Sequence, residues 1–179
     1  MIKKYNGKFI QVMEEDIEGA IYEKVFIQDS LTIFPFNSKG ELLLIKEKRV
    51  HESPPISWKC VTGFYEHEYD LEGNANRELQ EEIGKKAGTI TPFFDIRQSG
   101  TFNTHQHFVI ATDLTDSKIP NPDGEDTIIE VKAVGLDEVF TRTINGELSR
   151  GAAGYGILRL IHEIKVKSIK IPGLNFNSD

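Results

Sequence analysis

The sequence predicts a single α+β domain in which a mixed β-sheet is covered by helices on both faces. Two observations lead to this class. Short apolar segments with strand character fill the first half of the chain, and strand and helix patterns alternate in the second half. The 179 residues are enough for one domain with a proper hydrophobic core but barely enough for two domains. We therefore treat residues 1–179 as one domain.

The first half of the chain has the pattern of successive strands. We expect these strands at 8–14, 20–27, 30–36, 41–47 and 57–62, with a loop at Pro54-Pro55 before the last of them. Asn37-Ser38-Lys39-Gly40 separates the third strand from the fourth, and it has the residues of a hairpin turn. Gly40 is suited to the positive φ that such a turn requires.

Residues 71–83 change to a helical period, because apolar side chains recur every four positions at Leu71, Ala75, Leu79 and Ile83. Asp70 is a suitable N-cap for this helix, and Gly84 stands at the C′ position where helices commonly end. The helix therefore has defined ends and one apolar face that can pack against the sheet.

The second half of the chain combines strands with helices. We expect strands near 88–98 and 106–113, a polar loop at 114–126, a strand at 127–134, and helices at 136–142 and 152–165. The remaining residues, about 166–179, are predicted to form either a late strand or a loose tail.

Three carboxylates share one face of the predicted helix at 71–83. Glu78, Glu81 and Glu82 are spaced i, i+3 and i+4, so in water they repel one another. A hard divalent cation reverses that effect, because Mg²⁺ prefers oxygen ligands and often shares them with substrate phosphates. Arg77 offsets part of this charge. The alternative is an exposed helix with an ion pair such as Arg77 to Glu81.

The context of these carboxylates resembles the Nudix hydrolase family. The box of that family is a glycine, five residues, a glutamate, seven residues, and then Arg-Glu-aliphatic-x-Glu-Glu-x-Gly-aliphatic. Six of the seven charged or glycine positions match at the family's spacing, namely Gly63, Arg77, Glu78, Glu81, Glu82 and Gly84. From average residue usage, a chance match at one starting position is about 10⁻⁷, so the signal is strong.

Two positions depart from the box. Tyr69 stands in place of its first glutamate, and Lys85 stands in place of its closing aliphatic residue. In the family, the missing glutamate supports the helix arginine. Three nearby carboxylates are candidates to replace it: Glu66, Glu68 and Glu72. If none of them does so, the resemblance implies weakened catalysis or a protein that binds without turnover.

The resemblance extends to most of the chain and is greatest with the ADP-ribose pyrophosphatase branch. The stretches that carry it are 41–49, 57–63, 108–114, 124–139 and 144–161. It implies a Nudix-type α/β/α sandwich with a mixed β-sheet, and a homodimer to which about residues 1–28 contribute strands. Lys59 stands where the branch usually has glutamate. Val61-Thr62 replace Pro-Ala, and the proline usually found about sixteen residues after the box is missing. These departures together put ADP-ribose itself in doubt and leave a nucleoside diphosphate derivative as the substrate class.

The resemblance also implies roles for individual residues. Glu78 and Glu82 would be metal ligands, together with the backbone carbonyl of Thr62. Glu81 would be a ligand or would orient the attacking water, and Arg77 would support these carboxylates as part of the catalytic machinery. The implied cofactor is Mg²⁺ or Mn²⁺.

Further residues are expected to contact the substrate or the transferred proton. Glu125 matches the branch's mobile-loop glutamate and is a candidate general base, with Asp126 as the other possible register. The resemblance implies that Arg49 contacts a phosphate and that the box glycine Gly63 lies in the substrate site. Two aromatic side chains could stack on a base, Phe102 and Trp58, although Trp58 could equally belong to the core.

The predicted reaction is metal-dependent hydrolysis of the pyrophosphate linkage in a substrate such as ADP-ribose or another nucleotide sugar. It gives a nucleoside monophosphate and a phosphorylated remainder. A Nudix enzyme for CoA, dinucleoside polyphosphates, capped RNA or nucleoside triphosphates is also compatible with the sequence. So are a non-catalytic Nudix-like module that binds or senses a nucleotide, and a plain scaffold with an acidic helix.

Composition excludes several other classes of protein. The net charge of −7 gives no overall basic field for duplex nucleic acid, and no apolar run approaches the roughly 20 residues that span a bilayer. The N-terminus lacks a secretory signal, and the single cysteine, Cys60, cannot form an internal disulfide, so we expect a cytoplasmic protein. The histidines lack the spacing of a zinc site, although His105 and His107 could lie on one strand face.

Overall fold

The computed structural model describes residues 1–120, 127–148 and 151–174, which form a seven-stranded sheet, a three-stranded sheet and the helices around them. The larger sheet has the strand order β1-β2-β3-β9-β4-β7, and β8 pairs with β9. Strand β9 runs parallel to β3 and β4, and the other pairs are antiparallel, so the sheet is mixed as predicted. Its strands are β1 (Ile2–Asn6), β2 (Ile10–Ile17), β3 (Ala20–Ile27), β4 (Ser30–Pro35), β7 (Val61–Phe64), β8 (Lys85–Gln98) and β9 (Phe102–Asp116).

The smaller sheet is antiparallel and has the order β10-β5-β6. Its strands are β5 (Leu42–Lys48), β6 (Ile56–Lys59) and β10 (Ile128–Val134). The turn before β5 forms as expected, with Gly40 at φ 76°. The expected hairpin was wrong, because β4 and β5 join different sheets and share only the isolated bridge Phe36↔Leu42. Strand β5 uses its backbone hydrogen bonds to pair with β6 and β10 instead.

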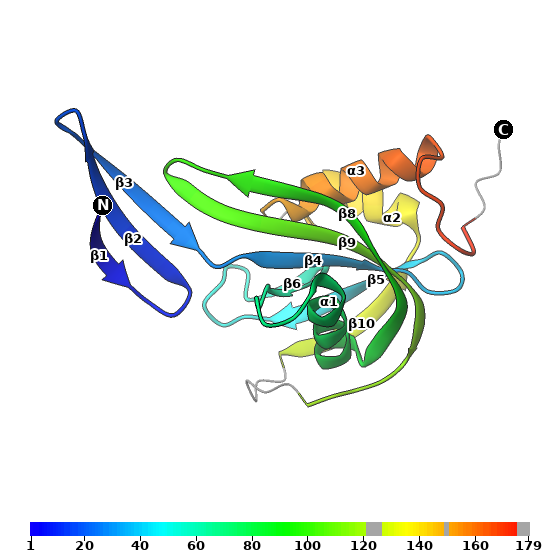
Figure 1. Cartoon of the computed structure of the whole chain (residues 1–179). Coiled ribbons are helices and arrows are strands. Elements are labelled where there is room, and N and C mark those ends of the chain that lie inside the picture. Colours follow the sequence, from blue (N-terminus) through cyan, green and yellow to red (C-terminus); the bar gives the residue numbers. More distant parts are fainter. Residues whose placement is uncertain (121–126, 149–150, 175–179) are drawn as a thin grey trace.

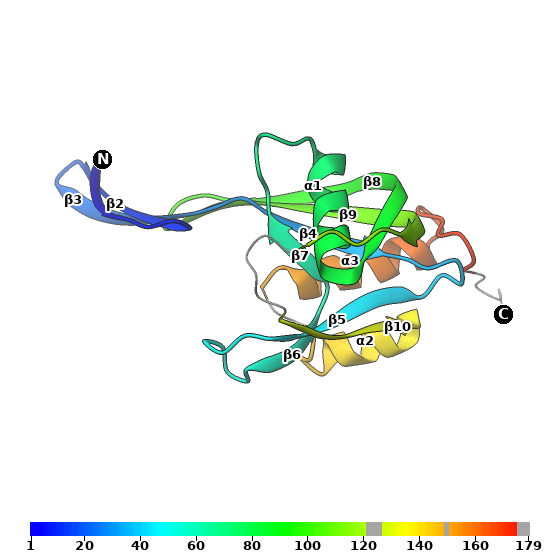
Figure 2. The ribbon, with the colours of Figure 1, turned by 90° about the horizontal axis from the view of Figure 1, so that it is seen from below.

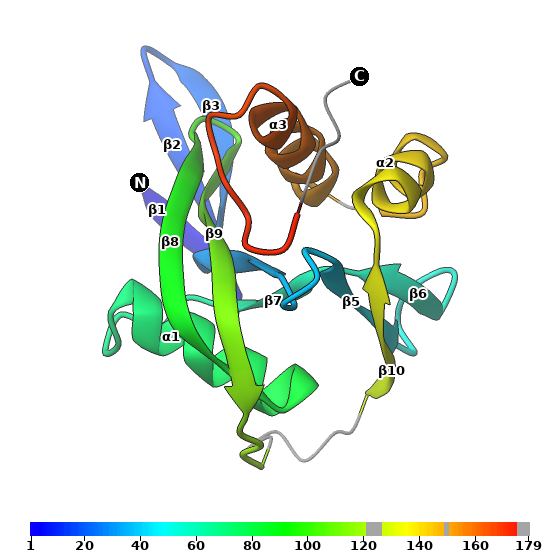
Figure 3. The ribbon, with the colours of Figure 1, turned by 90° about the vertical axis from the view of Figure 1, so that its right-hand side faces the viewer.

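Helices cover both faces of the larger sheet, which confirms the predicted architecture. Figure 2 shows α1 on one side of β4, β8 and β9 and α3 on the other, and Figure 3 shows α2 lying beside the smaller sheet. The expected helix at 71–83 changes after its first two turns into a π-helical turn, η1. The bounds are α1 (Leu71–Glu78), η1 (Leu79–Ile83), α2 (Leu136–Ile144) and α3 (Ala153–Lys165).

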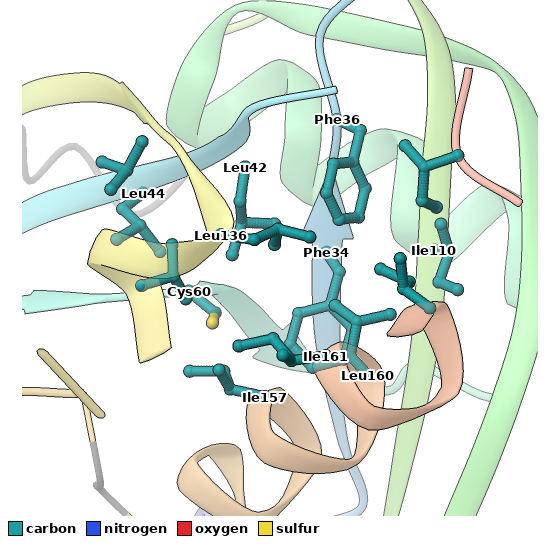
Figure 4. Close-up of a cluster of buried hydrophobic side chains, with 14 of the residues drawn as sticks. Phe34, Phe36, Leu42, Leu44, Cys60, Ile110, Leu136, Ile157, Leu160 and Ile161 are labelled. Carbon is teal, nitrogen blue, oxygen red and sulfur yellow. The ribbon is translucent and has the colours of Figure 1, made fainter. Parts of the chain in front are cut away.

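Two hydrophobic clusters hold these layers together. The larger cluster joins both sheets to α2 and α3, and Figure 4 shows Phe34 and Ile110 from the larger sheet near Ile157 and Leu160 of α3. The smaller cluster lies under α1 and η1, and it contains Leu31, Ile33, Ile45, Val61, Ala75, Leu79, Ala87, Val109 and Ala111. The helix that carries the carboxylates is therefore fixed to β4 and β7 by apolar packing.

The first three strands project from this body as an arm (Figure 1). Strand β1 was not expected, because its sequence is short and mostly polar. Strand β3 joins the body through the pairs Val25↔Phe102 and Phe26↔Asn103 with β9. The arm exposes large apolar side chains, including Ile2, Tyr5, Ile17, Ile21 and Tyr22.

The chain after α3 forms turns over residues 166–174 rather than a late strand. Ile171 is buried, and Ile169 and Leu174 pack against the larger cluster. This segment of the tail is therefore part of the core. Among the described residues, no helix is long and apolar enough to cross a membrane.

Candidate active site

The glycine, arginine and glutamates of the box lie around one cavity of about 880 Å³. Its walls come from the N-terminal arm and the ends of β5 and β7, from α1 and η1, and from the start of β10. Charged side chains of both signs line it: Glu47, Glu66, Glu78, Glu81 and Glu82, with Lys8, Lys48, Arg49 and Arg77. A cavity of this size accommodates a small-molecule ligand.

Gly63 makes room for the first helix carboxylate. A Cβ added to Gly63 would stand 2.0 Å from Cδ of Glu78 and 2.3 Å from its Oε1, which is far inside any normal contact. Glu78 therefore packs directly against the backbone of β7. This steric requirement explains why a glycine precedes the helix and why Gly63 and Glu78 must act as a pair.

Two carboxylates in the cavity lie in surroundings that disfavour their charge. Burial raises the pKa of Glu78 to about 8, with Arg77 lowering it and Glu82 and Glu81 raising it. Burial likewise raises the pKa of Glu82 to about 7, although the nearby Lys59 ammonium lowers it. Burial thus disfavours the charged form of both carboxylates.

Arg77 contacts three carboxylates. Its Nη2 atom is 2.8 Å from Glu78 Oε1 and 3.2 Å from Glu66 Oε1, and its Nη1 atom is 3.4 Å from Glu81 Oε2. Of the three candidates for the missing box glutamate, Glu66 is the one among the described ion pairs of Arg77. Glu66 therefore takes over at least part of the support that the box position would give.

Tyr69, which stands at the box position itself, presents its ring face to Arg77 with the guanidinium carbon 6.0 Å from the ring centroid. This distance is at the outer limit of a cation–π contact. The Nε atom of Arg77 is buried and has no hydrogen-bond partner among the described residues. Tyr69 has a ring face rather than a carboxylate near Arg77, and within the described part of the chain one donor of the guanidinium has no acceptor.

A buried asparagine holds the loop that carries Glu66. The side chain of Asn74 in α1 donates to the carbonyls of Glu66, Tyr69 and Asp70 at 2.9–3.1 Å, and its Oδ1 accepts from the Glu66 N–H at 2.9 Å. Asp70 caps α1 as predicted, accepting from Gly73 N–H at 2.7 Å. The position of Glu66 is therefore determined by a side chain eight residues later.

Lys59 and Glu47 form a second group of charged side chains next to Glu82. Lys59 Nζ is 2.7 Å from Glu47 Oε2, 3.7 Å from Glu82 Oε1 and 3.1 Å from Thr62 Oγ1. The buried Glu47 also accepts from Arg49 Nε at 2.8 Å. The lysine that departs from the branch pattern thus provides a cation close to the predicted metal ligands, and Glu47 connects it to Arg49.

The structure brings most of the predicted site residues together, with two exceptions. Arg49, Thr62, Gly63, Arg77 and the three helix glutamates all line the cavity. Phe102 is not among the described lining residues and lies at the base of the arm, opposite Val25. Glu125 and its alternative Asp126 lie outside the described residues. Trp58 packs against the larger core cluster, with the Arg142 guanidinium 4.9 Å from its ring.

The arrangement fits a hard divalent cation. Glu78 and Glu82 supply buried carboxylate oxygens, and their raised pKa values reflect insufficient compensation of their negative charge. Mg²⁺ and Mn²⁺ prefer such ligands, and binding requires the carboxylates to release their protons. Glu78 and Glu82 would hold the ion, with Glu81 beside them on the same helical segment.

Comparison with known proteins agrees with this geometry. The family model described as NUDIX domain matches residues 27–151. A solved structure titled "Crystal structure of ADP compounds hydrolase" superimposes with a TM-score of 0.74 at 18% identity, covering 94% of this chain and 93% of that one. A structure from a study of MutT of Aliivibrio salmonicida and Vibrio cholerae gives a TM-score of 0.49 at 19% identity, covering 65% of this chain and 83% of that one. No curated protein matches.

The family match covers more than half of the chain and includes the glycine, the arginine and the three glutamates that line the cavity. The chain therefore belongs to the Nudix hydrolase family.

Proposed function

We propose that this protein uses Mg²⁺ or Mn²⁺ to hydrolyse the pyrophosphate linkage of a nucleoside diphosphate derivative such as ADP-ribose or another nucleotide sugar. The products are a nucleoside monophosphate and a phosphorylated remainder. The observation that carries the proposal is the pair of carboxylates, buried Glu78 and largely buried Glu82, beside a cavity of about 880 Å³ with basic groups on its walls. The fold it shares with an ADP compounds hydrolase supports the substrate class.

The metal ion, when bound, neutralises the pyrophosphate and provides a water of lowered pKa. Glu78 and Glu82 would hold it. The Thr62 N–H donates to Glu82 Oε2 at 3.3 Å, and the N–H and C=O of a strand residue point to the same side, which supports the Thr62 carbonyl as a further ligand. Arg77 holds Glu78 and Glu81 in place through contacts of 2.8 Å and 3.4 Å. Glu81 then orients the attacking water or adds a ligand.

Positive groups that line the cavity are suited to the substrate phosphates. Arg49 is held at its Nε by Glu47, which leaves its terminal nitrogens directed to other partners such as Glu52 at 3.9 Å. We assign Arg49 to phosphate binding and Gly63 to the floor of the substrate site. Glu125 is our proposed general base. In support, Thr127, two positions later, lines the cavity and donates to Glu47 Oε1 at 3.1 Å.

The projecting arm supports a homodimer. Ile2 and Ile21 are 65% and 61% exposed, which is unusual for large apolar side chains in strands of a monomer. A second copy of the chain would cover them, and we propose a cytoplasmic homodimer. Light scattering of the full chain should give twice the mass of one chain. A monomer at micromolar concentration would contradict this.

A substrate panel tests the proposed reaction. Nucleotide sugars, CoA, dinucleoside polyphosphates, capped RNA and nucleoside triphosphates are incubated with increasing Mg²⁺ or Mn²⁺, and the monophosphate product is quantified. The proposal requires metal-dependent turnover that is highest with a nucleoside diphosphate derivative. Turnover only of another class would move the enzyme to that substrate.

Tyr69 favours a second candidate, a Nudix module that binds a nucleotide without turnover, because it leaves Arg77 Nε without a partner among the described residues. The contact from Glu66 to Arg77 argues against it. Stabilisation by ADP-ribose in a thermal shift assay, with no product under any metal, would establish the binding module and refute the enzyme.

A further inference from the structure

Two histidines and two aspartates gather at the junction of the arm and the body, apart from the active-site cavity. Asp29 lies in the link between β3 and β4, His105 and His107 lie on β9, and Asp95 lies on β8. None of the four is among the described residues that line the cavity. The catalytic proposal does not use these residues, so their arrangement needs an explanation of its own.

Strand geometry places both imidazoles on one face of β9, because residues two apart in a strand point to the same side. Their ring centroids are 3.9 Å apart. One ligand atom each from Asp29, His105 and His107 can be chosen so that all three lie within 4.8 Å of one another. All three side chains are half-buried, so their donor atoms converge in a place partly shielded from water.

Asp95 contacts both rings from the neighbouring strand, where it pairs with His107 in the sheet register. Its Oδ1 atom is 3.1 Å from His107 Nδ1, and its Oδ2 atom is 3.2 Å from His105 Nε2. These contacts leave His105 Nδ1, 4.0 Å from Asp29 Oδ2, and His107 Nε2 as the nitrogens available to a further partner. A carboxylate that holds the outer nitrogen of a metal-bound imidazole is a common arrangement.

Simple ion pairing between these residues accounts poorly for the geometry. His105 Nε2 is buried and makes no well-aligned hydrogen bond to any described residue, although Asp95 Oδ2 is 3.2 Å away. Two imidazoles in contact would also repel each other if both were charged. A cation between His105, His107 and Asp29 would need neutral rings and would use their free nitrogens.

The chemistry of the donors identifies the class of ion. Two imidazole nitrogens and a carboxylate oxygen suit zinc and similar transition metals, whereas Mg²⁺ prefers oxygen ligands. Donor atoms around tetrahedral zinc, with bonds of about 2.0–2.1 Å, lie roughly 3.3 Å apart. The 4.8 Å limit of the present cluster is wider, so metal binding would require the side chains to rotate and bring their donor atoms closer together.

We propose that Asp29, His105 and His107 form a second metal site, of the zinc class, with Asp95 as the residue that positions the two rings. The site would join the arm to the body. It would also contact the loop that carries Glu66, because Tyr65 N–H donates to the Asp29 carbonyl at 2.8 Å and the Tyr65 ring centroid is 4.6 Å from that of His107.

Cobalt titration tests this site separately from the catalytic one. Co²⁺ is added to the full-length Glu82→Gln protein, in which the catalytic carboxylates are impaired, and visible absorption is recorded. Low-symmetry coordination by nitrogen and oxygen gives intense bands, whereas octahedral oxygen coordination gives weak ones. We expect one equivalent of Co²⁺ to bind with intense bands and Zn²⁺ to displace it.

Substitutions at the cluster complete the test. His107→Gln and Asp29→Asn should each weaken Co²⁺ binding by about 10–100-fold or more, and His162→Gln on the exposed face of α3 should leave it unchanged. Circular dichroism establishes that each variant is folded, and either cluster variant alone is sufficient for the comparison. Absence of the intense bands in Glu82→Gln, or unchanged affinity in both cluster variants, would overturn the proposal.

Discussion

The substitution Glu82→Gln should stabilise the metal-free protein in a pH-dependent way. Burial raises the pKa of Glu82 from the ordinary 4.5 to about 7, so the folded state binds more protons than the unfolded state between these values. Stability therefore falls as pH rises through this interval, because ionising Glu82 costs more in the folded protein. Glutamine keeps the shape and an acceptor for the Thr62 N–H, and it cannot ionise.

The size of the effect follows from the pKa shift. One pKa unit corresponds to about 1.4 kcal/mol, so at pH 8 the whole shift lowers the free energy of unfolding of the wild type by about 3 kcal/mol. At pH 5, where Glu82 is mostly protonated in the folded protein, the effect is about 1 kcal/mol. Urea unfolding of both proteins in the presence of a chelator measures this difference across the pH range. Saturating Mg²⁺ should reverse the order, because metal at about 1,000 times its Kd adds about 4.1 kcal/mol to the wild type alone, which exceeds the difference of about 3 kcal/mol.

A difference between the two proteins that stays constant from pH 5 to pH 8 would refute the reasoning. It would mean that Glu82 is well compensated in the folded protein and that the cavity creates no demand for a cation. Glu41→Gln is a matched control, because Glu41 lies in the turn before β5 and outside the described cavity lining. That variant should show the pH dependence of the wild type.

Three further predictions concern the residues around these carboxylates. Gly63→Ala should displace the Glu78 carboxylate, which lowers the activity and lowers the free energy of unfolding by about 1–3 kcal/mol. Gly135→Ala is the control, because a Cβ at that position meets nothing within 4 Å, and it should change activity little. Equal kinetics of the two variants would show that the Gly63–Glu78 contact is unimportant. Tyr69→Glu should give Arg77 another carboxylate and raise kcat severalfold, which steady-state kinetics measures, and a lower kcat would show that the tyrosine is the better support. Lys59→Met removes the cation that lowers the pKa of Glu82, so the acidic limb of the pH–activity profile should move to higher pH. An unchanged pH–activity profile would show that Lys59 does not influence the ionisation of Glu82.

Features that depend on nearby residues were predictable from the sequence. The helix after residue 70 has its apolar period, its Asp70 cap and its Gly84 terminus within one short segment, and the structure confirms all three. Gly84 takes the left-handed conformation, with φ 65°. The convergence of Gly63 and Arg77 with the helix glutamates was implied by the resemblance to the Nudix box, and helix spacing alone placed the three glutamates on one face.

Features that depend on distant partners were not predictable in the same way. Strand β5 pairs with β10, which lies in the second half of the chain, and this pairing separates it from β4 in spite of a good hairpin turn. The choice of Glu66 over Glu68 and Glu72 depends on the loop path that Asn74 holds. The β1 strand exists because β2 offers a partner, not because its own sequence is strongly β-forming.

The second cluster shows the same limit at the level of a site. His105 and His107 were recognisable from the sequence as a pair on one strand face. Each offers one ligand atom, so the pair alone supplies two ligands to a metal ion. Asp29 and Asp95 reach them through the arm junction and the pairing of β8 with β9, which local spacing does not reveal.

The most direct test of the central claim is the initial rate of nucleoside monophosphate formation from the best substrate of the panel, measured against Mg²⁺ for the wild type and Glu82→Gln. We predict a rate that saturates with Mg²⁺ in the wild type and is at least ~100-fold lower in Glu82→Gln. A rate that does not depend on the metal, or that is the same in both proteins, would contradict the assignment of Glu78 and Glu82 as metal ligands.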